Sequence, residues 1–540
     1  MNITNVWAAP STRSCFKNSA PYIDDTNTFT LDAAKGESVS MQIMIKNGAD
    51  LKSTEDAVNK AIKISDAVIT QLSGTHFDTE SIKIQAQEYI SFADGIAYPD
   101  PISNGMAAEI PANNSGAFWV TFPVTETQKS GEYRFRISLN SNIETDLSVE
   151  VTLKVYNVTI PKSSDALYNI EHFTNPEDSV MFETNGYTFR PFDEEWWKFV
   201  EKYANSLREC RSNVYRLYPL HLLKGAGSKR ISKEKWHLDF SVFDRLVKIL
   251  TESGAVKRFS IDDFLTPLDG TEIFSLDENG DIVKIPKSET EADIWLEYYL
   301  TSLYNHAKEL GIADSLIMHI QDEPRSPETW LWGKSVVKKY MPGIKCGNPI
   351  GKKIAALLGD EVDLYIPIFN AAELELDFYT EESKKPDKEV WPYCCCIPYQ
   401  SWFLQRFIDS PLIRSRLIGW ATYSRGFTGF LHYGYSYWQR TEQFYPYSTE
   451  MYSAHKGDCM LIYPSPEDNS YKISARYINI RDGAQDYELL KIAEKYDKVK
   501  AKELSNSIAA GYTEFTEDEK MLVNARRELL KLAESAVENT

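Results

Sequence analysis

Short runs that alternate between apolar and polar residues recur through the first 160 positions of the chain. The clearest lie at 39–45, 117–122, 133–137 and 148–155, with turn residues between them. Alternation with a period of two turns one side of a strand toward a core and the other toward solvent. Evenly spaced short strands of this kind predict an N-terminal antiparallel β-sandwich over residues 1–160.

From about residue 165 the pattern changes, and short apolar runs alternate with stretches of helical periodicity. Eight candidate strands lie at 167–173, 213–217, 258–262, 316–321, 344–346, 362–369, 390–397 and 429–433. Helical patterns separate them, at 194–209, 240–252, 292–310, 328–340, 352–358, 371–382 and 411–424. Eight such units predict a (β/α)8, TIM-like barrel over 165–470. A doubly wound open sheet is the alternative, although no glycine-rich nucleotide-binding motif follows any strand.

The last stretch, 471–540, is charged and helical. Apolar residues recur at helical spacing over 486–502 and 516–537, and the second of these runs begins with acidic residues, as a first helical turn prefers. We expect these C-terminal helices to pack on the barrel. A separate interaction module is the alternative.

Length and charge narrow the class of protein. The chain has 540 residues, more than one ordinary core holds, and a net charge of −19 that disfavours nucleic acid and anionic membranes as partners. No run of about 18 apolar residues predicts a transmembrane helix, so we expect no membrane insertion. The N-terminus lacks the basic and apolar regions of a signal peptide. We therefore expect a cytoplasmic enzyme, with an exported mature form left open.

The cysteines and histidines do not suggest a disulfide framework or a metal site. Three of the seven cysteines are consecutive, at Cys394, Cys395 and Cys396. On a strand, neighbouring side chains point to opposite faces, so these three cannot converge on one ion. We expect them to be small buried residues in a reducing compartment. No HExxH motif or spaced set of ligands appears, so we expect no metal and no cofactor.

The most suggestive chemistry follows the fourth candidate strand, which ends in Asp322 and Glu323 before Pro324. Catalytic groups of a parallel barrel stand at the carboxyl ends of its strands. Two neighbouring carboxylates push their pKa values apart, so one can stay protonated while the other is ionised. That division suits glycoside hydrolysis, in which an acid protonates the leaving oxygen and an anion stabilises developing positive charge.

Adjacency of the two carboxylates favours one version of this chemistry. Glu323 could act as acid and base, while Asp322 binds the N–H of a substrate 2-acetamido group whose oxygen attacks the anomeric carbon. A second pair, Asp262 and Asp263, ends the third candidate strand. It could bind sugar hydroxyls, cap a loop, or supply the second carboxylate of a conventional glycosidase.

Further residues near the strand ends are candidates for sugar contacts. His172 ends the first strand and could bind a hydroxyl, whereas His319 is expected to pack inside the fourth strand. Aromatic residues gather near the ends of strands six to eight. Tyr435 and Trp438 follow the last strand, so we expect them to form walls on which a sugar ring stacks.

A series of motifs in the second half of the chain resembles a known family. It comprises VWPYCCC at 390–396, FID at 407–409, RLIGW at 416–420, GFL at 429–431, YW at 437–438, GD at 457–458, LIYP at 461–464, RDG at 481–483 and DYE at 486–488. The series is similar to that of glycoside hydrolase family 123 and of the related C-terminal domain of unknown function. The likeness runs from about 165 to 495.

The resemblance implies an N-terminal sandwich, a catalytic barrel and retaining exo-hydrolysis of β-linked N-acetylgalactosamine with participation of the acetamide. The family's Asp-Glu pair at the end of strand four matches Asp322 and Glu323. The chain departs from the family at His432-Tyr433, where an aromatic-Trp pair is usual, and in its three consecutive cysteines.

We interpret the chain as a β-N-acetylhexosaminidase that acts on a glycan or glycoconjugate, with Trp391, Tyr435 and Trp438 shaping the pocket. Tyr365 is a candidate donor to the acetamide oxygen. Two alternatives stay open: a conventional glycosidase that pairs Glu323 with Asp262 or Asp263, and a non-catalytic carbohydrate-binding protein. The sequence leaves the exact sugar and the oligomeric state undetermined.

Overall fold

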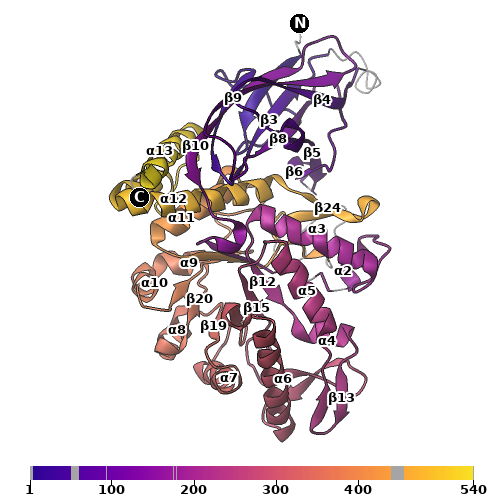
Figure 1. Cartoon of the computed structure of the whole chain (residues 1–540), viewed down its shortest axis with the longest axis vertical. Coiled ribbons are helices and arrows are strands. Elements are labelled where there is room, and N and C mark those ends of the chain that lie inside the picture. The colour runs from indigo at the N-terminus through magenta and orange to yellow at the C-terminus, as the bar shows by residue number, and fades with distance from the viewer. Residues whose placement is uncertain are drawn as a thin grey trace.

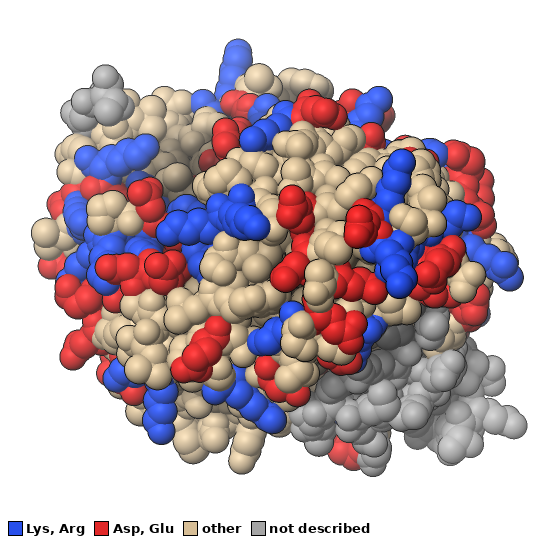
Figure 2. All heavy atoms as spheres, turned by 90° about the horizontal axis from the view of Figure 1, so that it is seen from below, with Lys and Arg blue, Asp and Glu red and all other residues tan. Residues whose placement is uncertain are grey.

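The computed structural model describes residues 4–49, 60–92, 94–173, 176–177, 179–438 and 455–538. The molecule is elongated, with a β-rich body at one end, an α/β body at the other and C-terminal helices between them (Figure 1). At the α/β end, acidic and basic side chains are interspersed, so their charges offset one another over that face (Figure 2). None of the described helices is long and apolar enough to cross a membrane.

The N-terminal body is a sandwich of two five-stranded sheets, which confirms the interpretation of the alternating runs. The first sheet has the order β1-β3-β8-β5-β6, with bounds Asn5–Pro10, Ser38–Lys46, Ser115–Pro123, Lys83–Ser91 and Ala97–Ile102. The second has the order β2-β10-β9-β4-β7, with bounds Thr28–Lys35, Ser148–Thr159, Gly131–Ser141, Ile62–Ser73 and Ala108–Ile110. The pairs are antiparallel apart from β10 with β2. Inward-facing residues such as Phe118 and Phe135 form the core.

The second body is a barrel of eight parallel strands in the order β21-β20-β19-β18-β15-β12-β11-β22. In chain order the strands are β11 (Asn169–His172), β12 (Val214–Leu217), β15 (Arg258–Ile261), β18 (Leu316–Met318), β19 (Lys345–Asn348), β20 (Leu364–Tyr365), β21 (Glu389–Val390) and β22 (Gly429–His432). A parallel bridge between Tyr393 and Leu431 joins the continuation of β21 to β22. The sheet thus closes on itself, which excludes the open doubly wound alternative.

Helices cover the outside of the barrel, as the alternating pattern predicts (Figure 1). They are α3 (Glu194–Cys210), α5 (Ser241–Glu252), α6 (Thr290–Glu309), α7 (Pro327–Tyr340), α8 (Lys352–Leu358), α9 (Phe369–Leu374), α10 (Leu376–Ser383) and α11 (Ile413–Arg425). Insertions that the sequence did not reveal add α2 (Ser179–Thr184), α4 (Pro219–Gly225), and the hairpins β13–β14 (Lys229–Ser232 and Lys235–His237), β16–β17 (Glu272–Leu276 and Ile282–Pro286) and β23–β24 (Ile462–Ser465 and Ser470–Ile473).

The C-terminal helices α12 (Ala475–Ala509) and α13 (Glu519–Glu538) join the two bodies rather than packing on the barrel alone. Ser474 caps α12 by accepting a hydrogen bond from the Tyr477 N–H, and the helix is kinked at Asp497. The first half of α12 is buried all round, charged residues included. Its helical period was therefore hidden in the sequence, and α12 begins earlier than the run at 486–502.

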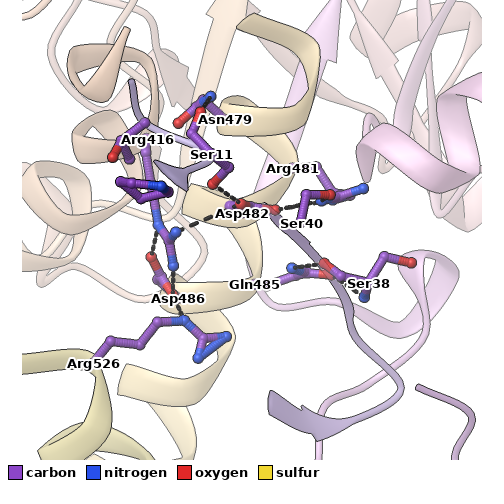
Figure 3. Close-up of polar contacts among 12 residues, drawn as sticks. Ser11, Ser38, Ser40, Arg416, Asn479, Arg481, Asp482, Gln485, Asp486 and Arg526 are labelled. Atoms are coloured by element: carbon purple, nitrogen blue, oxygen red, sulfur yellow. Dashed lines mark hydrogen bonds and ion pairs between the residues drawn. The ribbon is translucent and has the colours of Figure 1, made fainter. Parts of the chain in front are cut away.

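Mostly buried charges hold this junction together, and five of them form the junction cluster: Glu37, Arg416, Asp482, Asp486 and Arg526. Figure 3 shows the contacts among the last four of these residues. Asp486 is fully buried, with Oδ2 2.7 Å from the Arg416 Nε and Oδ1 2.9 Å from the Arg526 Nε. Arg526 also reaches Glu37 of the sandwich at 2.7 Å. Burial raises the pKa of Asp486, but the two guanidinium charges outweigh it and the net pKa is lowered. Asp486 therefore serves as an anion that ties α11, α12 and α13 together.

We predict that Asp486→Ala will destabilise the protein severely. The change leaves Arg416 and Arg526 buried beside too few carboxylates, and breaking a buried ion pair costs about 3–5 kcal/mol. The urea midpoint of unfolding should fall accordingly. Glu503→Ala on the same helix is the matched control, because its 3.9 Å pair with Lys500 is exposed and such pairs contribute less than about 1 kcal/mol. Equal shifts for the two variants would contradict this account of the junction.

Candidate active site

Asp322 and Glu323 stand at the carboxyl end of the barrel, just after β18. The N–H groups of Ile320 and Gln321 donate to the side-chain oxygen of Asn348 at 2.7 and 3.2 Å, so the end of β19 holds this segment in place. Glu323 has a φ of 44°, in the left-handed region that residues other than glycine seldom adopt. This turn leaves Glu323 exposed and Asp322 partly buried. Backbone strain of this kind gathers at functional sites.

The loop after β15 fixes the same turn from the other side. The Leu268 N–H donates to the Asp322 carbonyl at 3.1 Å, and the Arg325 N–H donates to the Leu268 carbonyl at 3.0 Å. The two backbone bonds flank Glu323, so its unusual φ is imposed by its surroundings.

The electrostatic setting of Asp322 is acidic and desolvated. Burial raises the pKa of its carboxyl to about 6, the negative charges of Asp263 and Glu323 add to the rise, and Arg216 opposes it. Asp322 thus changes charge near neutral pH, where an ordinary aspartate is fully ionised.

Arg216 of β12 is the positive centre of the barrel mouth. Its side chain is 6% exposed, its Nε lies 3.1 Å from Asp262 Oδ1, and its Nη2 lies 2.9 Å from Asp263 Oδ2. Its guanidinium stacks over the Phe173 ring at 4.0 Å. Asn348 donates to the other oxygen of Asp263 at 2.9 Å. Both members of the second acidic pair are therefore held by Arg216.

A small cavity of about 160 Å³ opens beside this pair. Asp262 and Asp263 lie on its wall, and aromatic and apolar side chains such as Tyr218, Phe274 and Ile282 complete it. Burial raises the pKa of Asp262, although the Arg216 charge opposes the rise. Of the substrate-binding residues expected from the sequence, Asp262 is the one that the structure places against an open space near the Asp322–Glu323 pair.

The interior below the mouth holds a further carboxylate, Glu171 of β11, which sequence reasoning missed. It is fully buried, and the Ser260 hydroxyl donates to it at 2.5 Å. His319 Nε2 lies 3.4 Å away, in an electrostatic contact rather than a directed hydrogen bond. Burial raises the pKa of Glu171, but His319, Arg216 and Ser260 outweigh it and the net pKa is lowered. The signal in the sequence that could have identified Glu171 was a charged residue within a strand predicted to be buried.

Tyr393, which continues β21, brings a phenol to the Asp322–Glu323 pair. Its hydroxyl lies 3.5 Å from Glu323 Oε1, at the outer limit of a hydrogen bond. Burial and the neighbouring Glu323 charge raise the pKa of Tyr393 well above its ordinary value. The phenol therefore stays protonated and can donate to Glu323 or to a bound substrate.

The structure places the five other expected binding residues in the core, away from solvent, and three of them pack between the barrel and its helices. His172 contacts the Ser212 hydroxyl at 3.0 Å, and the Tyr435 hydroxyl lies 2.7 Å from that of Ser206; both side chains are fully buried. The buried Tyr365 hydroxyl donates to Glu382 at 3.1 Å. These side chains fill space between the barrel and its helices, because large aromatic rings pack there once the strands are covered.

Trp391 lies at the opposite end of the barrel from the acidic pairs. Its ring is fully buried in the apolar cluster inside the ring of strands, and Arg258, the first residue of β15, stacks over it at 5.2 Å. Trp438 is fully buried as well, and its indole N–H donates to the Ile462 carbonyl at 2.9 Å. In this structure neither ring reaches the mouth.

The departure at His432-Tyr433 has a structural role. His432 Nε2 lies 3.1 Å from Asp458 Oδ1, and the Tyr433 hydroxyl donates to Asp458 Oδ2 at 2.8 Å. The two side chains thus hold the aspartate of the Gly457-Asp458 motif. Among the described residues, no group of three or more His, Cys, Asp or Glu side chains could hold a metal ion.

Comparison with known proteins agrees with this architecture. Residues 183–493 match the sequence profile of the glycoside hydrolase 123 catalytic domain. A family 123 glycoside hydrolase from Clostridium perfringens, described in a study of glycolipid glycan hydrolysis, has 15% sequence identity and a TM-score of 0.74. That alignment covers 99% of this chain and 98% of the other.

A GH5 xyloglucanase from Bacteroides ovatus also aligns, with 11% identity over 94% of this chain and 98% of that one, but its TM-score is 0.25. No functionally curated protein matches the sequence. The profile match spans more than half of the chain, from the end of α2 through the barrel strands β12 to β22 and into the first half of α12. The chain therefore belongs to glycoside hydrolase family 123.

Proposed function

We propose that this glycoside hydrolase removes β-linked N-acetylgalactosamine, or another N-acetylhexosamine, from a glycan end with retention of configuration. The observation that supports this most directly is the pair of neighbouring carboxylates with unlike settings. Asp322 is partly buried with a raised pKa, whereas Glu323 is exposed. One suits binding a polar group of the substrate, and the other suits exchanging protons with a leaving group and with water.

In the first step the acetamide oxygen attacks the anomeric carbon and the glycosidic C–O bond breaks. Glu323 gives its proton to the departing oxygen, and Asp322 accepts a hydrogen bond from the acetamide N–H, stabilising the oxazolinium cation. In the second step Glu323 takes a proton from water, and the water oxygen attacks the anomeric carbon from the side that the leaving group vacated. The bond from the acetamide oxygen to that carbon then breaks, which restores the original configuration.

A conventional mechanism through Asp262 or Asp263 is the second candidate, since both follow the neighbouring strand β15 and the charge of Asp263 acts on Asp322. Against it, both carboxylates are already paired with Arg216, and Asp263 also accepts from Asn348. A nucleophile in this position would have to weaken its charge-assisted hydrogen bonds to the guanidinium in order to attack the anomeric carbon. We therefore assign Asp262 to hydroxyl binding and Asp263 to setting the charge of Asp322.

We predict that Glu323→Gln will lower kcat for nitrophenyl β-N-acetylgalactosaminide by roughly 10²–10⁴-fold, the usual loss when a general acid–base is removed. Asp322→Asn should cost roughly 10²–10³-fold, as loss of a charge-stabilising group does. Neither variant should lower the melting temperature, because Glu323 is exposed and the folded state already disfavours a charge on Asp322.

The matched substrates for this test are the β-N-acetylgalactosaminide, the β-N-acetylglucosaminide and the β-galactoside. Turnover confined to acetamido sugars supports participation of the acetamide. Cleavage of the plain galactoside, with a larger loss in Asp262→Asn or Asp263→Asn than in Asp322→Asn, would favour the conventional mechanism instead.

We further predict that kcat/KM falls as the pH drops through about 6, since Asp322 must be ionised to accept the acetamide N–H. Asp263→Asn removes a negative charge that raises the pKa of Asp322, so the acid limb should move to lower pH. Asp281→Asn, an exposed change on the β16–β17 hairpin, should leave it in place. A limb that does not move in Asp263→Asn would refute this coupling.

A further inference from the structure

The seven cysteines differ sharply in accessibility. Five thiols are buried, at positions 15, 210, 346, 394 and 459, and all seven are free. Cys395 and Cys396 are the two that are partly exposed. A reagent that enters from solvent therefore meets these two sulfurs before any other.

The two partly exposed thiols converge, contrary to the expectation that neighbouring cysteines point to opposite faces. The chain leaves the strand geometry after Tyr393 and turns, with the Cys395 N–H donating to the Ile397 carbonyl at 3.0 Å. As a result the Cys395 and Cys396 Sγ atoms are 3.7 Å apart. Two sulfurs bound at about 2.3 Å to one tetrahedral soft atom stand at about this separation. The separation of the two sulfurs is thus suitable for both of them to bond to a single atom.

The pair also lies next to the catalytic machinery. It follows Tyr393 by two and three positions, and the Tyr393 hydroxyl is the group that lies 3.5 Å from Glu323 Oε1. Tyr393 and Leu431 bridge the two strands that close the barrel. A change in the conformation of the turn at 395–396 is therefore expected to displace Tyr393, the residue whose hydroxyl lies near Glu323.

We propose that Cys395 and Cys396 form a vicinal dithiol modification site at the barrel mouth, and that bridging the two sulfurs lowers hydrolase turnover through Tyr393 and Glu323. The effect on turnover rests on the proposed function of Glu323, whereas the modification itself does not. The site takes electrophiles that bond to two sulfurs at once: trivalent arsenicals, and peroxides that convert the pair to a disulfide.

Both reactions balance with the named reagents. An organoarsenic oxide loses its oxygen as water, which takes both thiol protons, while two As–S bonds form and the organic group remains as the third substituent of arsenic. Hydrogen peroxide oxidises the two thiols to one disulfide and is itself reduced to two molecules of water. Adjacent Cα atoms are about 3.8 Å apart, closer than the roughly 4.4–6.8 Å of ordinary disulfides, so the disulfide ring is strained and readily reduced again.

The test uses phenylarsine oxide on the full chain, read by mass spectrometry of the intact protein and of the peptide that contains 395–396. We expect one adduct per chain that spans both sulfurs, survives excess 2-mercaptoethanol and is removed by dithiothreitol. The adduct should abolish most turnover of the N-acetylgalactosaminide. Hydrogen peroxide should produce a loss of two hydrogens in the same peptide, reversible by dithiothreitol.

Cys395→Ser and Cys396→Ser supply the matched controls, because each keeps one sulfur and the shape of the turn. Both should retain basal turnover, form no adduct that resists 2-mercaptoethanol, and stay active with the arsenical. Adducts on other cysteines, or a bridging adduct that leaves turnover unchanged, would overturn the proposal. If no glycoside is hydrolysed at all, the proposed function fails, and the adduct still decides whether the dithiol site exists.

Discussion

A buried carboxylate is stable only where charged or hydrogen-bonding partners compensate it, and the architecture of this chain depends on one such carboxylate, Asp486. It is fully buried between Arg416 of α11 and Arg526 of α13, and Arg526 in turn holds Glu37 of the sandwich. Removing any one charge strands the others in a medium of low dielectric. These ion pairs therefore fix the barrel, the sandwich and the C-terminal helices in one relative arrangement.

The acidic residues at the barrel mouth have too little positive charge nearby to compensate all of them, and this determines their chemistry. There the positive charge is in short supply, because Arg216 is shared between Asp262 and Asp263 and is close to Glu171 as well. The Arg216 charge only partly offsets the other effects on Asp322, so burial and its acidic neighbours raise the pKa of Asp322 to about 6. In the junction cluster the charges are balanced, and the contact is fixed. At the mouth positive charge is deficient, so the carboxyl of Asp322 titrates in the pH range in which enzymes work.

The sequence predicted those features that follow from periodicity and failed where burial removes the period. The sandwich and the eight strands of the barrel were visible because one face of each element meets solvent or a helix. The first half of α12 was not, because it is buried on all sides with its charges paired. Asp322 and Glu323 could be placed at a strand end from the sequence, but Arg216 and Glu171 could not be linked to them, since the sequence does not show that β11, β12, β15 and β18 lie side by side in one sheet. The aromatic residues were assigned to the mouth by position along the chain, and position does not tell which way a ring points.

The motifs that resemble family 123 encode packing more than chemistry. A Cβ on Gly419 of RLIGW would lie 2.2 Å from the Gly483 carbonyl oxygen of RDG, and one on Gly483 would lie 2.3 Å from the Arg416 carbonyl oxygen. These two glycines let α11 and α12 touch backbone to backbone, which is what allows Arg416 to reach Asp486. In this chain these parts of the series therefore build the junction, and they do not by themselves require a particular sugar. We expect substrate choice to depend instead on the side chains at the carboxyl ends of β12, β15, β18 and β21, so that specificity changes when those residues change while the junction stays the same.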